Sequence, residues 1–162
     1  MKTLFLVRHA KSSWGDASLP DTQRPLNERG QRDAPMMGER LARRGVQPEL
    51  WLTSPAVRAR TTAEILGRKL GRASAGITVD DRLYGATVDT LLDVVHALDD
   101  RLKVVMLFGH NPGLSELAHR LSAQITHLPT CAVTEFKFDV DSWARIGHVG
   151  PVEAMLDTPK GA

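Results

Sequence analysis

The sequence predicts an α/β fold with a mainly parallel central sheet. Strand patterns and helix patterns alternate along the chain, which is typical of βαβ units. Two apolar runs predicted as strands, residues 1–7 and 103–108, each lead into a histidine, His9 after the first and His110 after the second. Because parallel strands end at the same edge of a sheet, both imidazoles can lie over the edge where open α/β folds bind ligands.

A polar loop over residues 11–24 follows the first strand and leads to the first predicted helix, about residues 28–44. Asn27 is suited to cap the N-terminus of this helix, and Gly45 is suited to end it as the C′ residue. The next run, residues 50–53, is short and apolar, and it predicts the second strand.

The second predicted helix begins directly after that strand and runs to about residue 71. Ser54 is suited to be its N-cap and Pro55 its first helical residue, because a proline there leaves no N–H unpaired. Residues 77–79 predict a short third strand. Residues 87–98 are amphipathic, with apolar positions at near-helical spacing, and predict the third helix.

The last part of the chain adds a strand over residues 103–108, a helix over about 112–121 and an alternating strand over 133–140. A weaker strand pattern covers residues 149–156. No internal repeat or linker interrupts these elements, and a chain of this length can bury roughly two thirds of its unfolded surface. We therefore expect one domain covering residues 1–162.

Composition argues against several classes of protein. The 21 Lys and Arg residues nearly balance the 19 Asp and Glu residues, and no dense basic run supports nucleic-acid binding. No apolar stretch approaches the ~18 residues of a membrane span, and the apolar run at the start is too short for a signal-peptide core. The single cysteine, Cys131, is expected to be a buried hydrophobe. We expect a cytoplasmic protein without a membrane or nucleic-acid partner.

His9 is the candidate nucleophile. A neutral imidazole carries a lone pair on one nitrogen and, with a reference pKa of about 6.5, is available unprotonated near neutral pH. An acceptor that holds its N–H would aim the other nitrogen at phosphorus, and the product would be a phosphohistidine intermediate hydrolysed by water. The neighbouring Arg8 could bind the phosphoryl oxygens, because guanidinium geometry matches phosphate.

Arg58 is the second candidate arginine. It falls in the first turn of the helix that follows the second strand, where free N–H groups and the helix dipole already favour anions. Arg60 lies two positions later and therefore on another face of the helix. We expect Arg58 to face the site and Arg60 to be solvated.

His110 is the second histidine of the predicted site, and it could donate a hydrogen bond to the transferring phosphoryl group. The other four histidines lack its place at a strand end and are expected to be structural or surface residues: His96, His119, His127 and His148. No histidine pair has the spacing of a metal motif, so we expect neither a metal nor another cofactor.

Together these residues lie in motifs that resemble the histidine phosphatase (phosphoglycerate mutase-like) superfamily, and its short branch of SixA-type phosphohistidine phosphatases in particular. The motifs are LVRHAK at residues 6–11, DTQRPLNERG at 21–30, TSPAVRARTTA at 53–63 and GHNP at 109–112. Each motif alone is weak, but their combination in this order is specific.

The resemblance implies a three-layer α/β/α sandwich of the phosphoglycerate mutase-like kind, with a mainly parallel sheet. It assigns the nucleophile to His9, the phosphate-binding arginines to Arg8 and Arg58, and the second histidine to His110. The short branch also implicates the arginine of the Arg-Pro-Leu segment, here Arg24, in phosphate binding.

Two positions depart from the superfamily pattern. Ala10 stands where glycine is usual, which implies an ordinary φ or some strain. Larger members supply a carboxylic acid to protonate the leaving oxygen, and no carboxylate aligns with that role here. Asp80 and Asp81, after the third strand, are expected to end a strand or cap a turn. General acid help is typically worth ~10²–10⁴ in rate, so its absence favours phosphohistidine, whose imidazole leaves readily.

Three functions remain open on the sequence alone. The leading hypothesis is a metal-independent phosphatase that removes phosphate from phosphohistidine on a protein, because no long insertion is available to build a lid. A phosphatase of a small phosphomonoester, such as a sugar or nucleotide phosphate, is the alternative, and a non-catalytic phosphate-binding module is a weaker third. Trp14, beside the predicted site, either anchors a partner protein or packs under its own loop.

Overall fold

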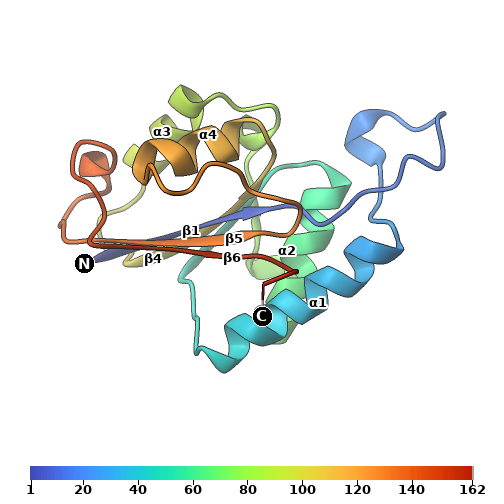
Figure 1. The fold of residues 1–162 in the computed structure, drawn as a ribbon, viewed down its shortest axis with the longest axis horizontal. Coiled ribbons are helices and arrows are strands. Elements are labelled where there is room, and N and C mark those ends of the chain that lie inside the picture. The colour runs from blue at the N-terminus through green and yellow to red at the C-terminus, as the bar shows by residue number, and fades with distance from the viewer. Residues whose placement is uncertain (162) are drawn as a thin grey trace.

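The computed structural model describes residues 1–161 and contains a six-stranded mixed sheet with helices on both faces (Figure 1). Residue 162, the last of the expected domain, lies outside the described residues. The strands are β1 (Lys2–Arg8), β2 (Leu50–Thr53), β3 (Thr78–Val79), β4 (Val104–Gly109), β5 (Val133–Phe138) and β6 (Glu153–Asp157). The helices are α1 (Glu28–Arg43), α2 (Val57–Leu70), α3 (Val88–His96) and α4 (Gly113–Leu121).

The strands lie in the order β3-β2-β4-β1-β5-β6. The first four are parallel to one another, whereas β5 pairs antiparallel with β1 and β6 antiparallel with β5. Helices α1 and α2 cover one face of the sheet, and α3 and α4 cover the other (Figure 1). The predicted α/β class and the three layers are therefore confirmed.

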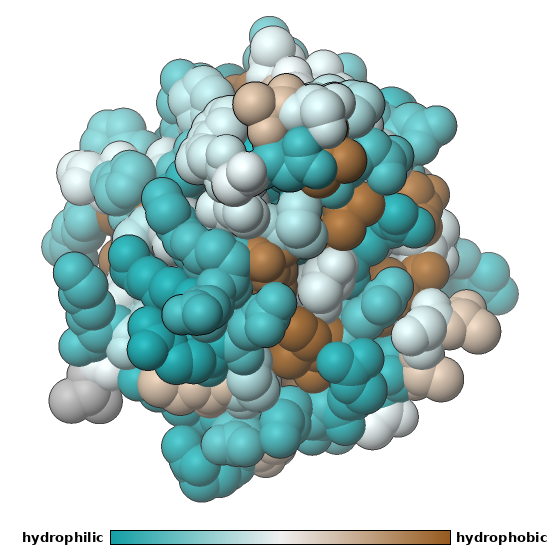
Figure 2. Space-filling model, turned by 90° about the vertical axis from the view of Figure 1, so that its right-hand side faces the viewer, coloured by the Kyte–Doolittle hydropathy of each residue, from teal (hydrophilic) through white to brown (hydrophobic). Residues whose placement is uncertain are grey.

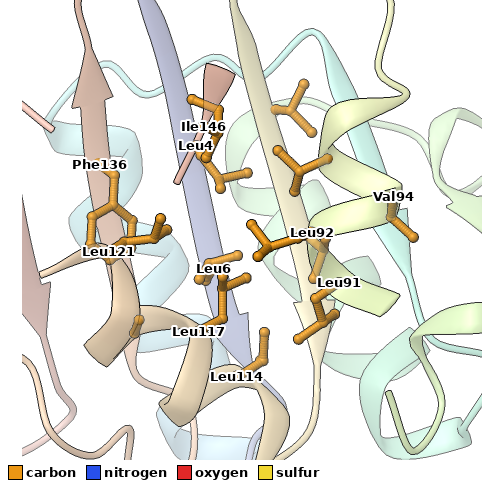
Figure 3. Packing of buried hydrophobic residues seen from close by; sticks show 14 of the residues in the cluster. Leu4, Leu6, Leu91, Leu92, Val94, Leu114, Leu117, Leu121, Phe136 and Ile146 are labelled. Atoms are coloured by element: carbon orange, nitrogen blue, oxygen red, sulfur yellow. The ribbon is translucent and has the colours of Figure 1, made fainter. Parts of the chain in front are cut away.

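Alternating side chains of β1 supply both faces of the sheet with apolar residues. Leu4 and Leu6 point to one face and pack with apolar residues of α3 and α4, a cluster shown in Figure 3. Phe5 and Val7 point to the other face and pack with residues of α1 and α2. These four side chains are at most 1% exposed, so the strand that leads to His9 is fixed by packing on both sides.

The pairing of β1 with β4 places the two predicted site histidines side by side. Arg8 is opposite Gly109 in the parallel register, so His9 and His110 each follow one residue beyond the paired ends. The His9 backbone N–H donates to the Gly109 carbonyl at 3.2 Å and extends the ladder by one bond. Both imidazoles therefore emerge at the same edge, as predicted.

Helix α1 has the predicted ends. The Asn27 side chain accepts a hydrogen bond from the Gly30 N–H, and Gly45 adopts a left-handed conformation with φ 72° just past the helix. The expected start of α2 was wrong. The helix begins at Val57 with Ala56 as a cap that makes no side-chain hydrogen bond. The Ser54 hydroxyl instead accepts the N–H of Ala56, one residue before the helix begins, and bonds to His110.

No helix within residues 1–161 is both long enough and apolar enough to cross a membrane.

Candidate active site

His9 lies at the base of the candidate site with 7% of its surface exposed. Its Nδ1 lies 2.7 Å from the carbonyl oxygen of Ala10. Because a carbonyl can only accept, Nδ1 carries the hydrogen and the lone pair is on Nε2. Burial, together with the nearby His110, Arg58 and Arg8, lowers the pKa of His9 to about 3, although the hydrogen bond to Ala10 acts in the opposite direction. At neutral pH His9 is therefore an uncharged imidazole with a fixed tautomer.

His110 lies beside His9, with 5.1 Å between the two ring centroids. Its Nε2 is 2.7 Å from the hydroxyl of Ser54, which also accepts a hydrogen bond from the Ala56 N–H. Burial and the charge of Arg58 lower the pKa of His110 to about 4, so this ring is also neutral near pH 7. The strand-end placement predicted for both histidines is therefore observed.

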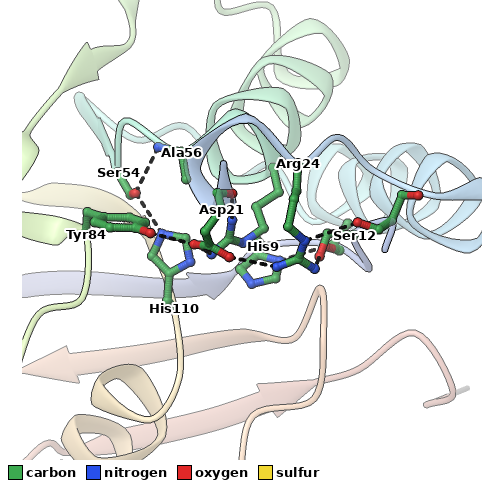
Figure 4. Close-up of polar contacts among 11 residues, drawn as sticks. His9, Ser12, Asp21, Arg24, Ser54, Ala56, Tyr84 and His110 are labelled. Carbon is green, nitrogen blue, oxygen red and sulfur yellow. Dashed lines mark hydrogen bonds and ion pairs between the residues drawn. The ribbon is translucent and has the colours of Figure 1, made fainter. Parts of the chain in front are cut away.

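Arg24 and Arg58 converge on one carboxylate, that of Asp21 (Figure 4). Arg24 reaches it from the loop before α1, with Nη1 2.9 Å from Oδ1. Arg58 reaches it from the first turn of α2, with Nη2 3.0 Å from Oδ2 and Nη1 2.7 Å from the Asp21 backbone carbonyl. Both guanidinium groups are largely buried, whereas 45% of the Asp21 side chain is exposed.

Arg8 approaches from the end of β1. Its Nη1 donates to the Leu128 carbonyl at 3.0 Å, whereas its Nε is buried without a hydrogen-bond partner. Nδ1 of His110 is likewise buried and unpaired. Among residues 1–161 only one further side-chain atom, on Asp33, shares this property. Native proteins rarely leave buried polar groups without a hydrogen-bond partner. Two such atoms, Arg8 Nε and His110 Nδ1, lie in this site.

The geometry brings together all five residues singled out in the sequence: Arg8, His9, Arg24, Arg58 and His110. Three arginines against one carboxylate leave the pocket positively charged, and both imidazoles are neutral. Such a site can bind a phosphate dianion through arginine N–H groups and present a free imidazole nitrogen to phosphorus.

Several contributors to the site were not predicted from the sequence. Tyr84 donates its hydroxyl hydrogen to Asp21 Oδ2 at 2.5 Å and meets His110 edge-on with a centroid distance of 5.6 Å. Thr62 accepts the Ala10 N–H at 2.9 Å, and Cys131 donates its backbone N–H to the His9 carbonyl at 3.0 Å. None of these contacts has a signal in the local sequence, because each joins segments far apart in the chain.

The backbone on either side of His9 is tightly held. Ala10 is fully buried, and the only non-glycine residue with a positive φ within residues 1–161 is Cys131, at 62°. Ala10 therefore has an ordinary φ, one of the two expectations for an alanine at this position. Cys131 is buried, as expected, and burial raises the pKa of its thiol to about 12, so it is not a thiolate.

The remaining charged candidates behave as expected. Arg60 is exposed on α2, and Asp80 follows β3 and accepts the Arg82 N–H as a cap. Of the other histidines, His96 bonds to the Ile146 carbonyl and stacks on His148, away from the site. Within residues 1–161 no cluster of three or more His, Cys, Asp or Glu side chains has the arrangement of a metal site.

The surroundings of the site are open. Trp14 is 74% exposed and lies flat over the Arg24 guanidinium, 3.3 Å from the ring centroid to Cζ, so it does not pack under its own loop. A groove of about 520 Å³ begins at Asn111 and Pro112, directly after His110, and runs along α4 to His127. Figure 2, which faces the end toward which β1 runs, shows a mostly hydrophilic surface with small separate hydrophobic patches.

Comparison with known proteins identifies the family. A sequence profile of the histidine phosphatase superfamily (branch 1) matches residues 4–88, which include four of the five candidate site residues. The chain belongs to this superfamily. An uncharacterised chloroplast protein of Arabidopsis thaliana is 32% identical over 151 residues, covering 88% of this chain and 69% of its own.

Solved histidine phosphatase structures share the whole fold. A candidate phosphohistidine phosphatase SixA from Agrobacterium tumefaciens is 26% identical, with a TM-score of 0.80 over 97% of this chain and 99% of its own. Another, from Nakamurella multipartitia, is 25% identical, with a TM-score of 0.81 over 98% and 96%. The expected phosphoglycerate mutase-like architecture and the resemblance to the short SixA-type branch are therefore confirmed.

Proposed function

We propose that this histidine phosphatase removes the phosphoryl group from phosphohistidine on a protein substrate, without a metal, by way of a phosphohistidine intermediate on His9. The observation that carries the proposal is the state of His9. Its Nδ1–H is held by the Ala10 carbonyl, its Nε2 is unprotonated, and burial keeps the ring neutral. A nucleophile needs these three properties to attack phosphorus at neutral pH.

The polar groups around His9 supply the binding of the phosphoryl group in this proposal. Arg8, Arg24 and Arg58 offer N–H groups to its oxygens, and His110 offers a further ring nitrogen. The unpaired Nε of Arg8 and Nδ1 of His110 support the same assignment, because a bound anion would give such buried groups a partner.

The lowered pKa values of Asp21 and Asp80 favour phosphohistidine over an alkyl phosphate as the substrate. Asp21 is the carboxylate nearest the pocket arginines, but bonds from Tyr84, Arg24 and Arg58 hold its pKa far below the usual range. Asp80 is also ionised more readily than usual, because it is paired with Arg82. Neither carboxyl group is protonated at neutral pH, so neither can protonate an alkoxide leaving group. An imidazole leaving group depends less on such protonation.

The open surroundings favour a protein as the carrier of the phosphoryl group. Trp14 is exposed beside Arg24, and the groove along α4 leads away from His110. The likeness to the two candidate SixA structures supports the same substrate class.

The proposal is tested by comparing hydrolysis of a phosphohistidine-bearing protein with that of p-nitrophenyl phosphate, for the wild type and for His9→Ala. We expect a strong preference for the phosphohistidine and loss of at least about 10³-fold in kcat in the variant. Faster turnover of the aryl phosphate would instead favour a small phosphomonoester as substrate. Undiminished turnover in His9→Ala would show that His9 is not the nucleophile.

A further inference from the structure

Asp21 is the one acidic side chain that contacts the arginines of the site in the described part of the chain. It belongs to the short 3₁₀ helix Asp21–Gln23, which lies in the chain between β1 and α1. Its two carboxylate oxygens bind Arg24 and Arg58, and Tyr84 donates a hydrogen bond to one of them (Figure 4). A negative charge is thus fixed among groups that otherwise attract anions.

The exposure of these side chains shows on which side of the pocket the charge lies. His9 is nearly buried, whereas nearly half of the Asp21 side chain and more than a third of Tyr84 are exposed. In a phosphoryl transfer the attacking and leaving atoms lie roughly in line on opposite sides of phosphorus. With His9 attacking from the base, the leaving group departs toward the open side, where Asp21 and Tyr84 lie.

The contacts of Asp21 leave room for a phosphate on the same arginines. A guanidinium carries five N–H groups. Arg24 gives one of them to Asp21, one to the Ser12 hydroxyl and one to the Ser13 carbonyl. Arg58 gives two to Asp21. The remaining N–H groups can bind phosphoryl oxygens while the carboxylate stays in place beside the leaving group.

We propose that Asp21 determines substrate specificity by favouring a substrate whose group bonded to phosphorus is cationic before the transfer and by opposing one in which that group is anionic. Phosphohistidine fits this selection when the ring nitrogen not bonded to phosphorus is protonated, because the carboxylate can accept that N–H. A phosphomonoester that carries its own carboxylate meets like charge instead. The inference rests on the proposed function and names the charge of the substrate that the site prefers.

The chemistry of the transfer balances without a separate acid. The His9 Nε2 lone pair forms a bond to phosphorus, and the electrons of the substrate P–N bond return to the departing nitrogen. The substrate ring, cationic before the step, leaves as a neutral imidazole that keeps its N–H near Asp21. His9 becomes a phosphoimidazolium whose Nδ1–H remains on the Ala10 carbonyl. Water then attacks phosphorus, giving dihydrogen phosphate and neutral His9.

The test compares three substrates that differ in the charge of the leaving group: a phosphohistidine peptide, p-nitrophenyl phosphate and phosphoglycolate. We measure kcat/KM for the wild type and for Asp21→Asn, which removes the charge and keeps the size of the side chain. We expect the ratio of phosphohistidine to phosphoglycolate to fall by about tenfold or more, as expected for one partly exposed charge.

Two further variants separate charge from structure. Asp16→Asn removes the same charge from the same loop, where Asp16 is exposed and bonds only to Ser18. Tyr84→Phe removes the hydrogen bond from Tyr84 to Asp21 but leaves the Asp21 carboxylate in place. We expect both variants to retain the wild-type substrate ratio, whatever they do to the absolute rates.

The outcomes distinguish this inference from the function on which it rests. If Asp21→Asn changes kcat/KM for all three substrates by the same factor, Asp21 only supports the arginines and the inference is wrong. An equal shift of the ratio in Asp16→Asn would also overturn it. If the wild type prefers p-nitrophenyl phosphate to the peptide, the proposed function fails, and the ratio of p-nitrophenyl phosphate to phosphoglycolate in Asp21→Asn decides the role of the charge.

Discussion

The ionisation state and the tautomer of His9 are set by its neighbours. The Ala10 carbonyl fixes which ring nitrogen is protonated, and burial among positive groups lowers the pKa to about 3. A free imidazole titrates near pH 6.5 and exchanges between its two neutral tautomers. The residues around His9 therefore hold the proposed nucleophile in one ionisation state and one orientation.

Arg58 provides a residue-scale test with a matched control two positions away. Replacing Arg58 by Lys keeps the positive charge but removes the planar fork that reaches Asp21 through two nitrogens. We expect kcat/KM to fall by about 10²-fold or more, the usual cost of losing a preorganised donor. Arg60→Lys, on the exposed face of α2, should leave kcat/KM unchanged. Equal effects of the two substitutions would contradict a special role for Arg58.

Trp14 offers a second residue-scale prediction. Its ring is mostly exposed and lies on the Arg24 guanidinium, so it can contact a protein that presents its phosphoryl group to the site. We expect Trp14→Ala to lower kcat/KM for a phosphohistidine protein by about tenfold, and to lower it much less for p-nitrophenyl phosphate. Unchanged activity on both substrates would show that Trp14 does not bind a partner.

At the scale of elements, the loop between β1 and α1 is held against the helix by a close backbone approach. Asn27 donates its backbone N–H to the Lys11 carbonyl at 3.0 Å. A Cβ added at Gly30, in the first turn of α1, would lie 2.2 Å from the same carbonyl oxygen. Only glycine fits there without moving the loop that carries Asp21 and Arg24.

Gly30→Ala should therefore destabilise the protein and disturb the site. We expect the free energy of unfolding to fall by about 1–3 kcal/mol, as for other overpacked positions, and kcat/KM to fall with it. The control is Gly150→Ala, because an added Cβ at Gly150 has no neighbour within 4 Å. Chemical denaturation of the two variants gives the comparison, and similar losses in both would refute the close-approach argument.

Regular elements could be predicted because local patterns encode them. The apolar run of β1, the Asn27 cap and the Gly45 terminus each act within a few residues, and the structure contains all three. The start of α2 was misjudged: the Ser54 hydroxyl bonds to the Ala56 N–H before the helix begins and to His110, a residue distant in sequence. Asp21 was missed for the same reason, since its partner Arg58 belongs to another element.

For the molecule as a whole, the two buried histidines link stability to pH. Their folded-state pKa values, about 3 for His9 and about 4 for His110, lie below the unfolded value of about 6.5. Between these limits the unfolded chain binds more protons than the folded one, so stability falls as pH falls. The stability that the two neutral histidines contribute is fully present above about pH 6.5 and is lost as the pH falls toward 4.

Denaturation at pH 7 and at pH 5 tests this linkage. We expect the wild type to lose on the order of 1 kcal/mol per pH unit for each histidine. The variant His110→Asn should lose less over the same interval, because one of the two groups is gone. Carboxylates with lowered pKa values, such as Asp21, titrate below pH 5 and therefore contribute little to the difference between pH 7 and pH 5. Identical losses in the two proteins would contradict the pKa assignment of His110.

The central claim is that the phosphoryl group passes through His9, and trapping the phosphoenzyme tests it most directly. The wild type would be mixed with a phosphohistidine protein, quenched in alkali to preserve phosphohistidine, digested and sequenced by mass spectrometry. We expect a phosphorylated His9 in the wild type and no phosphorylated residue in His9→Ala. A phosphoryl group on His110 or on any other residue, or turnover with no phosphoenzyme at any quench time, would contradict the account.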